Sequence, residues 1–270
     1  MTLREATEIL RASGIEDARD EARRIFSAIG RMPHYKLLPQ DAACEDAAVQ
    51  EAIRRRAARE PLAYVIGEVD FYRESYEVTE DTLIPRPDTE ILVETAIKNL
   101  PHGARFLDLC TGSGCIALSV LNNTKETGAV AVDVSQGAIS VAKRNAERLG
   151  LTERVEFIVC DATERAIDGD FYAVISNPPY VTDAEYEELE PEIYFEPKAA
   201  FVGGEDGADF YRSLTALYRG VCERGGFIAY EIGYMQGNIL RDIAKEHGLN
   251  CEIIKDLGGR DRVALLCKKS

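Results

Sequence analysis

The residues best suited to chemistry in this sequence form the tetrapeptide Asn177-Pro178-Pro179-Tyr180. The Asn177 side-chain carbonyl and the Pro178 backbone carbonyl can each accept a hydrogen bond from an NH2 group. Prolines lack an N–H and fix φ at about −65°, so the segment is stiff and rich in acceptors. Tyr180 adds a flat ring against which a planar amide or base could stack. Such a site could orient a nitrogen lone pair towards an electrophile; the alternative is a plain turn, because Asn-Pro is a common turn dipeptide.

A second candidate site is the segment from Asp108 to Gly114, DLCTGSG, which lies between a predicted strand and a predicted helix. Its glycines allow a tight turn and let a ligand approach the backbone closely. Amides at the start of the following helix offer donors to an anionic group. The next strand ends at Asp133, whose carboxylate could accept both hydroxyls of a ribose. A third strand ends at Asp161-Ala162, where side chains could meet an adenine ring.

The glycine-rich segment also matches another class of cofactor site. Residues 112–117 fit the fingerprint G-x-G-x-x-A of nicotinamide-dependent dehydrogenases, which carry an acid about twenty residues further on. Two features favour a cationic aminoacyl-sulfonium ligand instead: Asp108 brings a negative charge to the turn, and a dehydrogenase has no need of the acceptors around Asn177. The structural alternative is that the glycines only let a helix pack on a strand.

These candidate residues fall on an alternating pattern of strands and helices. Strands are predicted at 104–109, 129–133, 154–159, 171–176, 226–232, 251–256 and 262–267, and helices at 114–123, 135–149, 209–223 and 235–247. This alternation predicts an α/β fold with a doubly wound, mostly parallel sheet. Only a Gly-Gly-Arg turn separates the last two strands, so the final strand should run antiparallel to its neighbour. Ligands of such folds bind at the carboxyl ends of the strands, where the candidate residues lie.

The N-terminal quarter of the chain has a helical pattern. Thr2 and Glu5 have capping-box spacing, apolar residues recur at helical spacing through 15–29, and a third helix is predicted at 46–59, with Pro61 beyond its end. A short hairpin at 68–72 and 76–79, a Pro-rich turn at 83–88 and a helix at 88–99 follow. We therefore expect a helical domain at 1–67, a hairpin and Pro-rich linker at 68–87, and an α/β domain at 88–270.

Length, composition and charge restrict which classes of protein this chain can belong to. The 270 residues allow one large domain and a small one, and no apolar run approaches the length of a membrane helix. Seven cysteines without a C-x-x-C pair and an N-terminus without a signal sequence indicate a reduced, cytoplasmic protein. Three scattered histidines argue against a metal site. Acidic residues outnumber basic ones 47 to 32, a balance that favours a protein partner over nucleic acid; the basic cluster at 54–56 is expected to be a solvated helix face.

The combined motifs resemble class I S-adenosylmethionine-dependent methyltransferases from about residue 92 to the end. The pairing of DLCTGSG with NPPY narrows the resemblance to enzymes that methylate nitrogen on amides or exocyclic amines. The segments LIPRPDTE at 83–90, FEP at 195–197 and DLGGRDR at 256–262, with the helical N-terminal domain, look like the bacterial release factor glutamine methyltransferase family (PrmC/HemK). The resemblance covers essentially the whole chain, and it implies a Rossmann-like seven-stranded sheet whose last strand is antiparallel.

The resemblance also implies an activity and a set of site residues. The expected activity is methylation of the side-chain amide nitrogen (N5) of the glutamine in the Gly-Gly-Gln motif of class 1 peptide chain release factors. The implied cofactor contacts, together with the strand-end carboxylates, are Asp108, Cys110, Thr111, Gly112, Ser113, Gly114, Asp133, Asp161, Ala162 and Asn177. The glutamine pocket falls on Asn177, Pro178, Pro179 and Tyr180, of which Asn177, Pro178 and Tyr180 are the expected catalytic residues.

Two residues depart from the family pattern. Ala162 stands where an aromatic residue is frequent, which puts adenine stacking at that point in doubt, and Cys110 replaces a glycine or another small residue. For Arg86 and Glu90 we weigh a latch between the N-terminal domain and the site against an ordinary exposed ion pair. Residues 195–197 could flank the substrate entrance, whereas the acidic stretch 185–192 is expected to be a solvated loop.

Several functions compete with the favoured one. A close variant would methylate a glutamine of a ribosomal protein. A nucleic-acid adenine N6-methyltransferase also uses the NPPY motif, but it needs a base-flipping, phosphate-binding surface that the charge balance does not supply. A non-catalytic module that binds the cofactor and a partner would have no reason to keep Asn177. We expect a cytoplasmic monomer, a release factor as partner, no direct contact with nucleic acid or membrane, and S-adenosylmethionine as the cofactor.

Overall fold

The computed structural model describes residues 1–37 and 42–269, and the chain divides into two compact units. The first, called the helical unit below, comprises Met1–Val69, Val78–Glu80 and Glu190–Phe195. The second, called the α/β unit, comprises Asp70–Glu77, Asp81–Leu189 and Glu196–Ser270. A short piece of the region expected to form the second domain, Glu190–Phe195, therefore belongs to the helical unit.

The helical unit contains the helices α1 (Leu3–Ala12), α2 (Ala18–Ala28), α3 (Ala47–Ala57) and α4 (Leu62–Ile66) and the 3-10 turns His34–Leu37 and Pro191–Phe195. The predicted capping box begins α1: the Thr2 hydroxyl accepts the Glu5 N–H, and the Glu5 carboxylate accepts the Thr2 N–H. The apolar helix faces meet in one core, which includes Leu10, Ile25 and Ile53. The short helix α4 was not predicted; Pro61 follows α3 as expected, but it is also the N-cap of α4.

The basic cluster at 54–56 differs from the solvated face that the sequence predicts. Arg54 is exposed, whereas the Arg56 side chain is only 7% exposed. Arg56 donates hydrogen bonds to Glu21 at 2.5 Å and to Glu192 at 3.1 Å, and Arg59 donates to the second carboxylate oxygen of Glu192 at 2.7 Å. The expectation of a solvated acidic loop is thus wrong for Glu192, because two arginines compensate its charge in a half-buried ion-pair cluster.

The α/β unit is built on a seven-stranded sheet in the order β5-β4-β3-β6-β7-β9-β8. The strands are β3 (Arg105–Leu109), β4 (Gly128–Asp133), β5 (Val155–Val159), β6 (Ala173–Ser176), β7 (Phe227–Glu231), β8 (Leu249–Lys255) and β9 (Asp261–Lys268). Strands β3 to β7 pair in parallel, and β9 is antiparallel to β7 and β8. The predicted doubly wound sheet with an antiparallel last strand is confirmed. The strand order reverses between β3 and β6, which is where such sheets bind ligands.

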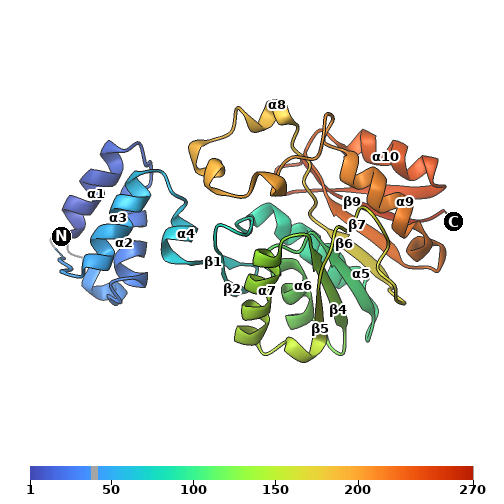
Figure 1. Cartoon of the computed structure of the whole chain (residues 1–270), viewed down its shortest axis with the longest axis horizontal. Coiled ribbons are helices and arrows are strands. Elements are labelled where there is room, and N and C mark those ends of the chain that lie inside the picture. The colour runs from blue at the N-terminus through green and yellow to red at the C-terminus, as the bar shows by residue number, and fades with distance from the viewer. Residues whose placement is uncertain (38–41, 270) are drawn as a thin grey trace. The chain divides into compact units, whose positions relative to one another are not determined.

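Helices cover both faces of this sheet (Figure 1). One apolar core packs α5 (Glu90–Asn99), α6 (Cys115–Asn122) and α7 (Gln136–Leu149) against side chains such as Phe106. The other packs α9 (Asp209–Glu223) and α10 (Gly237–Glu246) against side chains such as Leu107. Neighbouring residues of β3 thus point to opposite cores, as the period of two requires. The strand is buried on both sides, and its carboxyl end is held firmly where the glycine-rich turn begins.

Shorter elements connect these parts. β1 (Glu68–Phe71) and β2 (Glu74–Glu77) form a two-stranded sheet where the hairpin was predicted. The helix α8 (Asp183–Tyr186) and the 3-10 turns Pro87–Thr89, Thr152–Arg154 and Lys198–Ala200 were not predicted as separate elements. The long connection that contains α8 leaves β6 through the tetrapeptide at 177–180 and returns beside it: Val181 N–H donates to Phe201 O, and Gly203 N–H donates to Val181 O.

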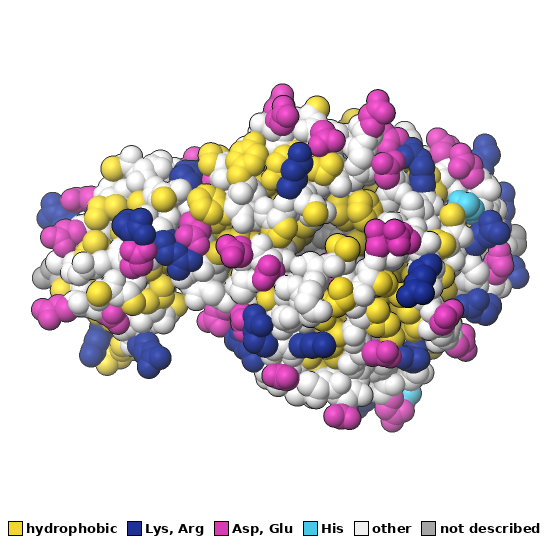
Figure 2. Space-filling view, viewed as in Figure 1, with side chains coloured by type: hydrophobic (Ala, Val, Ile, Leu, Met, Phe, Trp, Pro, Cys, Tyr) yellow, Lys and Arg dark blue, Asp and Glu magenta, His cyan; other side chains and the backbone are white. Residues whose placement is uncertain are grey.

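All seven cysteines are free thiols, two of them buried. Acidic and basic side chains are interspersed over the face of the α/β unit seen in Figure 2. Within residues 1–37 and 42–269, none of the helices combines the length and the apolar character needed to span a bilayer.

Candidate active site at the carboxyl edge of the sheet

A cavity of about 190 Å³ lies at the carboxyl ends of the parallel strands in the α/β unit. It brings together seven of the residues predicted from the sequence, namely Cys110, Gly112, Asp133, Asp161, Ala162, Asn177 and Pro179. Five others, Thr111, Ser113, Gly114, Pro178 and Tyr180, lie on the same two segments without lining it. The strand ends of β3, β4, β5 and β6 therefore converge on one hollow.

The glycine-rich turn adopts left-handed backbone conformations at three positions. Cys110, Gly112 and Gly114 have φ values of 60°, 55° and 81°. A Cβ at Gly112 would have no neighbour within 4 Å among the described residues, whereas a Cβ at Gly114 would lie 3.1 Å from the Cβ of Ala142 on α7. Gly114 therefore permits close helix packing, and Gly112 leaves open space on a cavity wall. A left-handed cysteine costs roughly 1 kcal/mol, which explains why glycine suits position 110.

Asp108 lies behind the turn and does not line the cavity. It is fully buried, and its Oδ2 accepts hydrogen bonds from the Thr111 hydroxyl at 2.5 Å and from the Ala117 N–H at 3.1 Å. Burial raises the pKa of the Asp108 carboxyl to about 7. Asp108 therefore has a structural role, because its side chain joins the glycine-rich turn to the start of α6.

Asp133 is the carboxylate that faces the cavity from β4. Its Oδ2 accepts the Gly112 N–H at 2.9 Å, and its Oδ1 accepts the Ser135 N–H at 2.9 Å. Burial raises the pKa of Asp133, and these backbone hydrogen bonds offset part of the rise. Each carboxylate oxygen keeps a lone pair for a ligand hydroxyl.

The end of the cavity beside β5 is formed by a different set of groups. The Asp161 carboxylate caps its own turn, with its Oδ1 accepting the Thr163 N–H at 2.8 Å. Ala162 supplies a small apolar wall, and Phe210 from α9 lines the same cavity. Sequence reasoning missed Phe210, because it is 48 positions from Ala162 and only the topology brings α9 to this edge. An aromatic ring is thus present although position 162 lacks one.

The tetrapeptide at 177–180 is held by several hydrogen bonds. Asn177 Nδ2 donates to the Thr89 hydroxyl at 3.3 Å. The Tyr180 hydroxyl donates to Glu231 Oε1 at 3.2 Å. The backbone carbonyl of Tyr180 accepts a hydrogen bond from Gln236 Nε2 at 3.0 Å. Among the described residues, none donates to Asn177 Oδ1 or to the Pro178 carbonyl. Asn177 Oδ1 and the Pro178 carbonyl are therefore available to accept hydrogen bonds from a ligand.

The returning loop presses directly on this backbone. A Cβ at Gly203 would lie 2.4 Å from the Pro179 carbonyl oxygen, and one at Gly207 would lie 2.2 Å from the Tyr180 carbonyl oxygen. Glycine is required at both positions because only hydrogen atoms fit there. The tetrapeptide is thereby fixed from the side of the loop as well as from β6.

The Pro-rich segment forms a latch inside the α/β unit. Arg86 pairs with Glu196, whose carboxylate also accepts the Ile84 N–H at 2.8 Å and whose side chain is only 1% exposed. Glu90 accepts the Tyr72 N–H at 2.9 Å. The expected alternative of an exposed Arg86–Glu90 pair is wrong, because each residue has another partner within the α/β unit. A latch to the N-terminal domain stays a prediction. The latch lies next to two cavity-lining stretches, since residues 81–83 precede Ile84, and Pro197, Ala199 and Ala200 follow Glu196.

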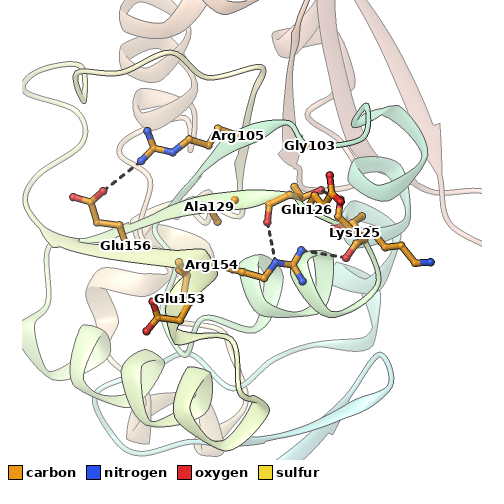
Figure 3. Close-up of a pocket in the computed structure, with 12 residues that line it drawn as sticks. Gly103, Arg105, Lys125, Glu126, Ala129, Glu153, Arg154 and Glu156 are labelled. Atoms are coloured by element: carbon orange, nitrogen blue, oxygen red, sulfur yellow. Dashed lines mark hydrogen bonds and ion pairs between the residues drawn. The ribbon is translucent and has the colours of Figure 1, made fainter.

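A wider hollow of about 920 Å³ lies at the opposite edge of the sheet, where β3, β4 and β5 begin (Figure 3). Both of its arginines are engaged by neighbouring residues: Arg154 donates to the Thr127 and Thr124 carbonyls at 3.0 and 3.1 Å, and Arg105 pairs with Glu156 at 3.4 Å. Ligands of doubly wound sheets bind at the carboxyl edge. The smaller cavity beside Asn177 is therefore the candidate site.

Comparisons of the sequence with known proteins point to one family. A family model described as PrmC N-terminal domain matches residues 2–67, and one described as Methyltransferase small domain matches residues 87–194. The release factor glutamine methyltransferase of Geobacter sulfurreducens is 38% identical over 260 residues, 94% of this chain and 91% of that protein. The protein of the same name from Rhodospirillum rubrum is 39% identical over 269 residues, 97% of this chain and 82% of its own. A solved methyltransferase from Pyrococcus furiosus shares the fold, with a TM-score of 0.53 at 18% identity over 72% of this chain and 89% of its own.

Proposed function

Since the chain belongs to the release factor glutamine methyltransferase family, we propose that it methylates class 1 peptide chain release factors. The methyl group goes from S-adenosylmethionine to the side-chain amide nitrogen (N5) of the glutamine in their Gly-Gly-Gln motif. One observation carries the proposal: no residue within 1–37 and 42–269 donates to Asn177 Oδ1 or to the Pro178 carbonyl, which lie beside the cavity at the carboxyl edge. They are the acceptors that an amide NH2 requires.

The cavity residues fit the proposed cofactor. Asp133 offers carboxylate oxygens to hydroxyls, Gly112 leaves open space at a backbone turn, and Phe210 and Ala162 give apolar surface for a flat base. We assign the ribose to Asp133, the adenine to the end of the cavity at Asp161 and Ala162, and the amino-acid part to the turn at 110–114. When bound, S-adenosylmethionine supplies a methyl group on a cationic sulfur, which is a strong electrophile.

The residues of the tetrapeptide then have to make a poor nucleophile react. An amide nitrogen is weakly nucleophilic because its lone pair is delocalised into the carbonyl. Asn177 Oδ1 and the Pro178 carbonyl accept hydrogen bonds from the two N–H groups of the amide. They so hold the nitrogen in line with the methyl group for displacement. The same acceptors stabilise the positive charge that develops on nitrogen. Pro179 and Tyr180 close the pocket beside the amide, and the departing proton leaves to water.

The remaining assignments concern the partner and the place of action. We assign recognition of the release factor to the helical domain at 1–67, which the N-terminal family model matches. The net charge of −15 supports a protein partner over a nucleic acid. The proposed enzyme is monomeric and acts in the cytoplasm.

Methyl transfer from radiolabelled S-adenosylmethionine tests the proposal. The substrates are purified release factor, the same factor with the glutamine of its Gly-Gly-Gln motif replaced by alanine, and duplex DNA. We expect label on the intact factor alone. Label on the substituted factor would place the reaction on another residue, and label on DNA would mean that the tetrapeptide serves an adenine N6-methyltransferase.

A further inference from the structure

The side-chain amide of Gln236 joins three segments at the carboxyl edge of the sheet. Gln236 is the N-cap of α10, and its Oε1 accepts the N–H of Gly233, in the turn after β7, at 2.9 Å. Its Nε2 donates to the Tyr180 carbonyl at 3.0 Å and to the Gly207 carbonyl at 3.2 Å. One side chain therefore ties the last residue of the tetrapeptide to the returning loop and to the start of α10.

The partners of the Gln236 amide allow it only one orientation. A backbone N–H can only donate and a backbone carbonyl can only accept. Oε1 therefore has to face Gly233, and Nε2 has to face Tyr180 and Gly207. An acceptor and two donors are needed on one side chain, and an ionised glutamate in its place would have no donor.

Two glycines let the Gln236 amide reach the backbone. A Cβ at Gly207 would lie 2.8 Å from Gln236 Nε2, and a Cβ at Gly233 would lie 3.0 Å from Gln236 Oε1. Gly207 is buried and has a left-handed backbone, with φ at 69°. The backbone on two sides of this half-buried amide is thus shaped to admit it.

The tetrapeptide depends on such an anchor because its centre has no donors. Pro178 and Pro179 carry no N–H, so hydrogen bonds can hold the middle of the segment only through its carbonyls. The Pro178 carbonyl is the acceptor that we assign to the substrate amide. Gln236 binds the carbonyl of Tyr180 instead, and so fixes the segment while the acceptor for the substrate stays open.

We propose that Gln236 is a positioning residue for methyl transfer, which holds the tetrapeptide against the returning loop. It thereby sets where Asn177 Oδ1 and the Pro178 carbonyl meet the substrate amide. Gln236 is not among the described residues that line the cavity, so it acts through the tetrapeptide. The inference rests on the proposed function, because it concerns how the acceptors of that reaction are held in place.

The variant Gln236→Glu removes the donors without changing the shape of the side chain. Its carboxylate can still accept the Gly233 N–H, but its second oxygen faces the carbonyl oxygens of Tyr180 and Gly207. The repulsion should move the end of the tetrapeptide away from the loop. Gln236→Met removes the donors without adding a charge and should have a weaker effect. Asn238→Asp, the same chemical change at an exposed position of α10, is the matched control.

The test uses the full-length enzyme, radiolabelled S-adenosylmethionine and intact release factor, and labelling by the native enzyme first establishes the proposed function itself. A small misplacement of reacting groups is costly, so we expect Gln236→Glu to lower kcat about tenfold or more. The KM for release factor, and the dissociation constant of S-adenosylmethionine by calorimetry, should stay within about threefold of native, because only the alignment of the amide changes. Asn238→Asp should keep the native kcat.

A double variant separates positioning from a general structural effect. If Gln236 acts by placing Asn177, a displaced tetrapeptide has less to lose once the Asn177 side chain is gone. In the Asn177→Ala background we therefore expect Gln236→Glu to lower kcat by less than about threefold. Independent changes add as free energies, so a structural effect elsewhere would lower kcat by the same factor in both backgrounds.

Two results would overturn the proposal while leaving the proposed function standing. One is native kcat in Gln236→Glu, and the other is the same loss of kcat in the two backgrounds. If Gln236→Glu fails to fold, Gln236→Met decides: native kcat there overturns the proposal, whereas a lower kcat with unchanged KM and cofactor affinity supports it. Absence of label on the intact factor with the native enzyme would overturn the proposed function, and with it this inference.

Discussion

At the scale of single residues, the side-chain orientation of Asn177 is the central feature of the proposed mechanism. Its Nδ2 is engaged by Thr89 while its Oδ1 faces no donor among the described residues. We expect Asn177→Ala to lower kcat by about 100-fold or more, since loss of one group that stabilises a developing charge has that effect, while cofactor binding by calorimetry is retained. Asn238→Ala, at an exposed position of α10, serves as control. Near-native kcat with unchanged cofactor affinity would contradict the assignment.

The buried Asp108 leads to a prediction of how folding stability depends on pH. Its pKa is raised by burial to about 7 in the folded protein, against about 3.9 in an unfolded chain. Ionisation of such a group favours the unfolded state, so its contribution to stability is fullest below about pH 4 and is lost as the pH rises to about 7. Asp108→Asn stays neutral, and its Oδ1 can still accept from Thr111 and Ala117.

The stability of Asp108→Asn relative to the native protein should therefore grow from pH 5 to pH 8, by on the order of 3 kcal/mol. Denaturant unfolding at pH 5, 6, 7 and 8 measures it, with the exposed Asp170→Asn as control. A difference that does not change with pH would show that Asp108 is ionised throughout this range.

Part of the site could be predicted from residue types alone. Asn177, Asp133 and the glycines follow apolar strands directly, so their place at the carboxyl edge follows from the strand pattern. Thr89 and Gln236 carry no such signal, because their role depends on contacts across the fold. Glu231 offers a weak one: an acid at the end of an apolar strand is expensive to bury and invites a search for its partners.

At the scale of elements, the latch between the Pro-rich segment and the loop after β6 controls two walls of the cavity. Glu196→Ala removes the buried partner of Arg86 and of the Ile84 N–H. We expect the free energy of unfolding to fall by about 2 to 4 kcal/mol and cofactor affinity, measured by calorimetry, to weaken. Asp183→Ala breaks the exposed pair with Lys198 and should change stability by less than about 1 kcal/mol. Equal effects of the two changes would mean that burial of Glu196 is unimportant.

The regular elements were predictable because each has its own period in the sequence. The strands β3 to β9 and the helices α6, α7, α9 and α10 lie within two residues or so of their expected bounds. The short helices α4 and α8 were missed, since five or four residues carry no measurable period. A local cap begins α8, the Thr182–Glu185 capping box, whereas α4 follows Pro61 without a side-chain cap.

At the scale of the whole molecule, sequence position and structural unit do not coincide. Residues 190–195 lie far along the chain from the N-terminal helices, yet they form part of the helical unit. One of the contacts that hold them there joins Arg56 to Glu192, which are 136 positions apart. Local sequence patterns carry no information about such a pair, which explains why both residues were expected to face solvent.

Replacing Glu192 therefore tests whether its ion pairs hold residues 190–195 in the helical unit. Glu192→Ala leaves the buried Arg56 with Glu21 as its carboxylate partner, and it leaves Arg59 with the Gly14 carbonyl but no carboxylate partner among the described residues. Burying an arginine is costly once a half-buried carboxylate partner is removed. We therefore expect the free energy of unfolding of the helical unit to fall by about 1 to 3 kcal/mol. Amide hydrogen exchange should accelerate at 190–195 and at the end of α3, while β3 to β7 keep their native protection. The exposed Glu190→Ala, two residues away, should leave exchange unchanged. Native exchange at 190–195 in Glu192→Ala would mean that apolar packing, and not the ion-pair cluster, holds this segment in the helical unit.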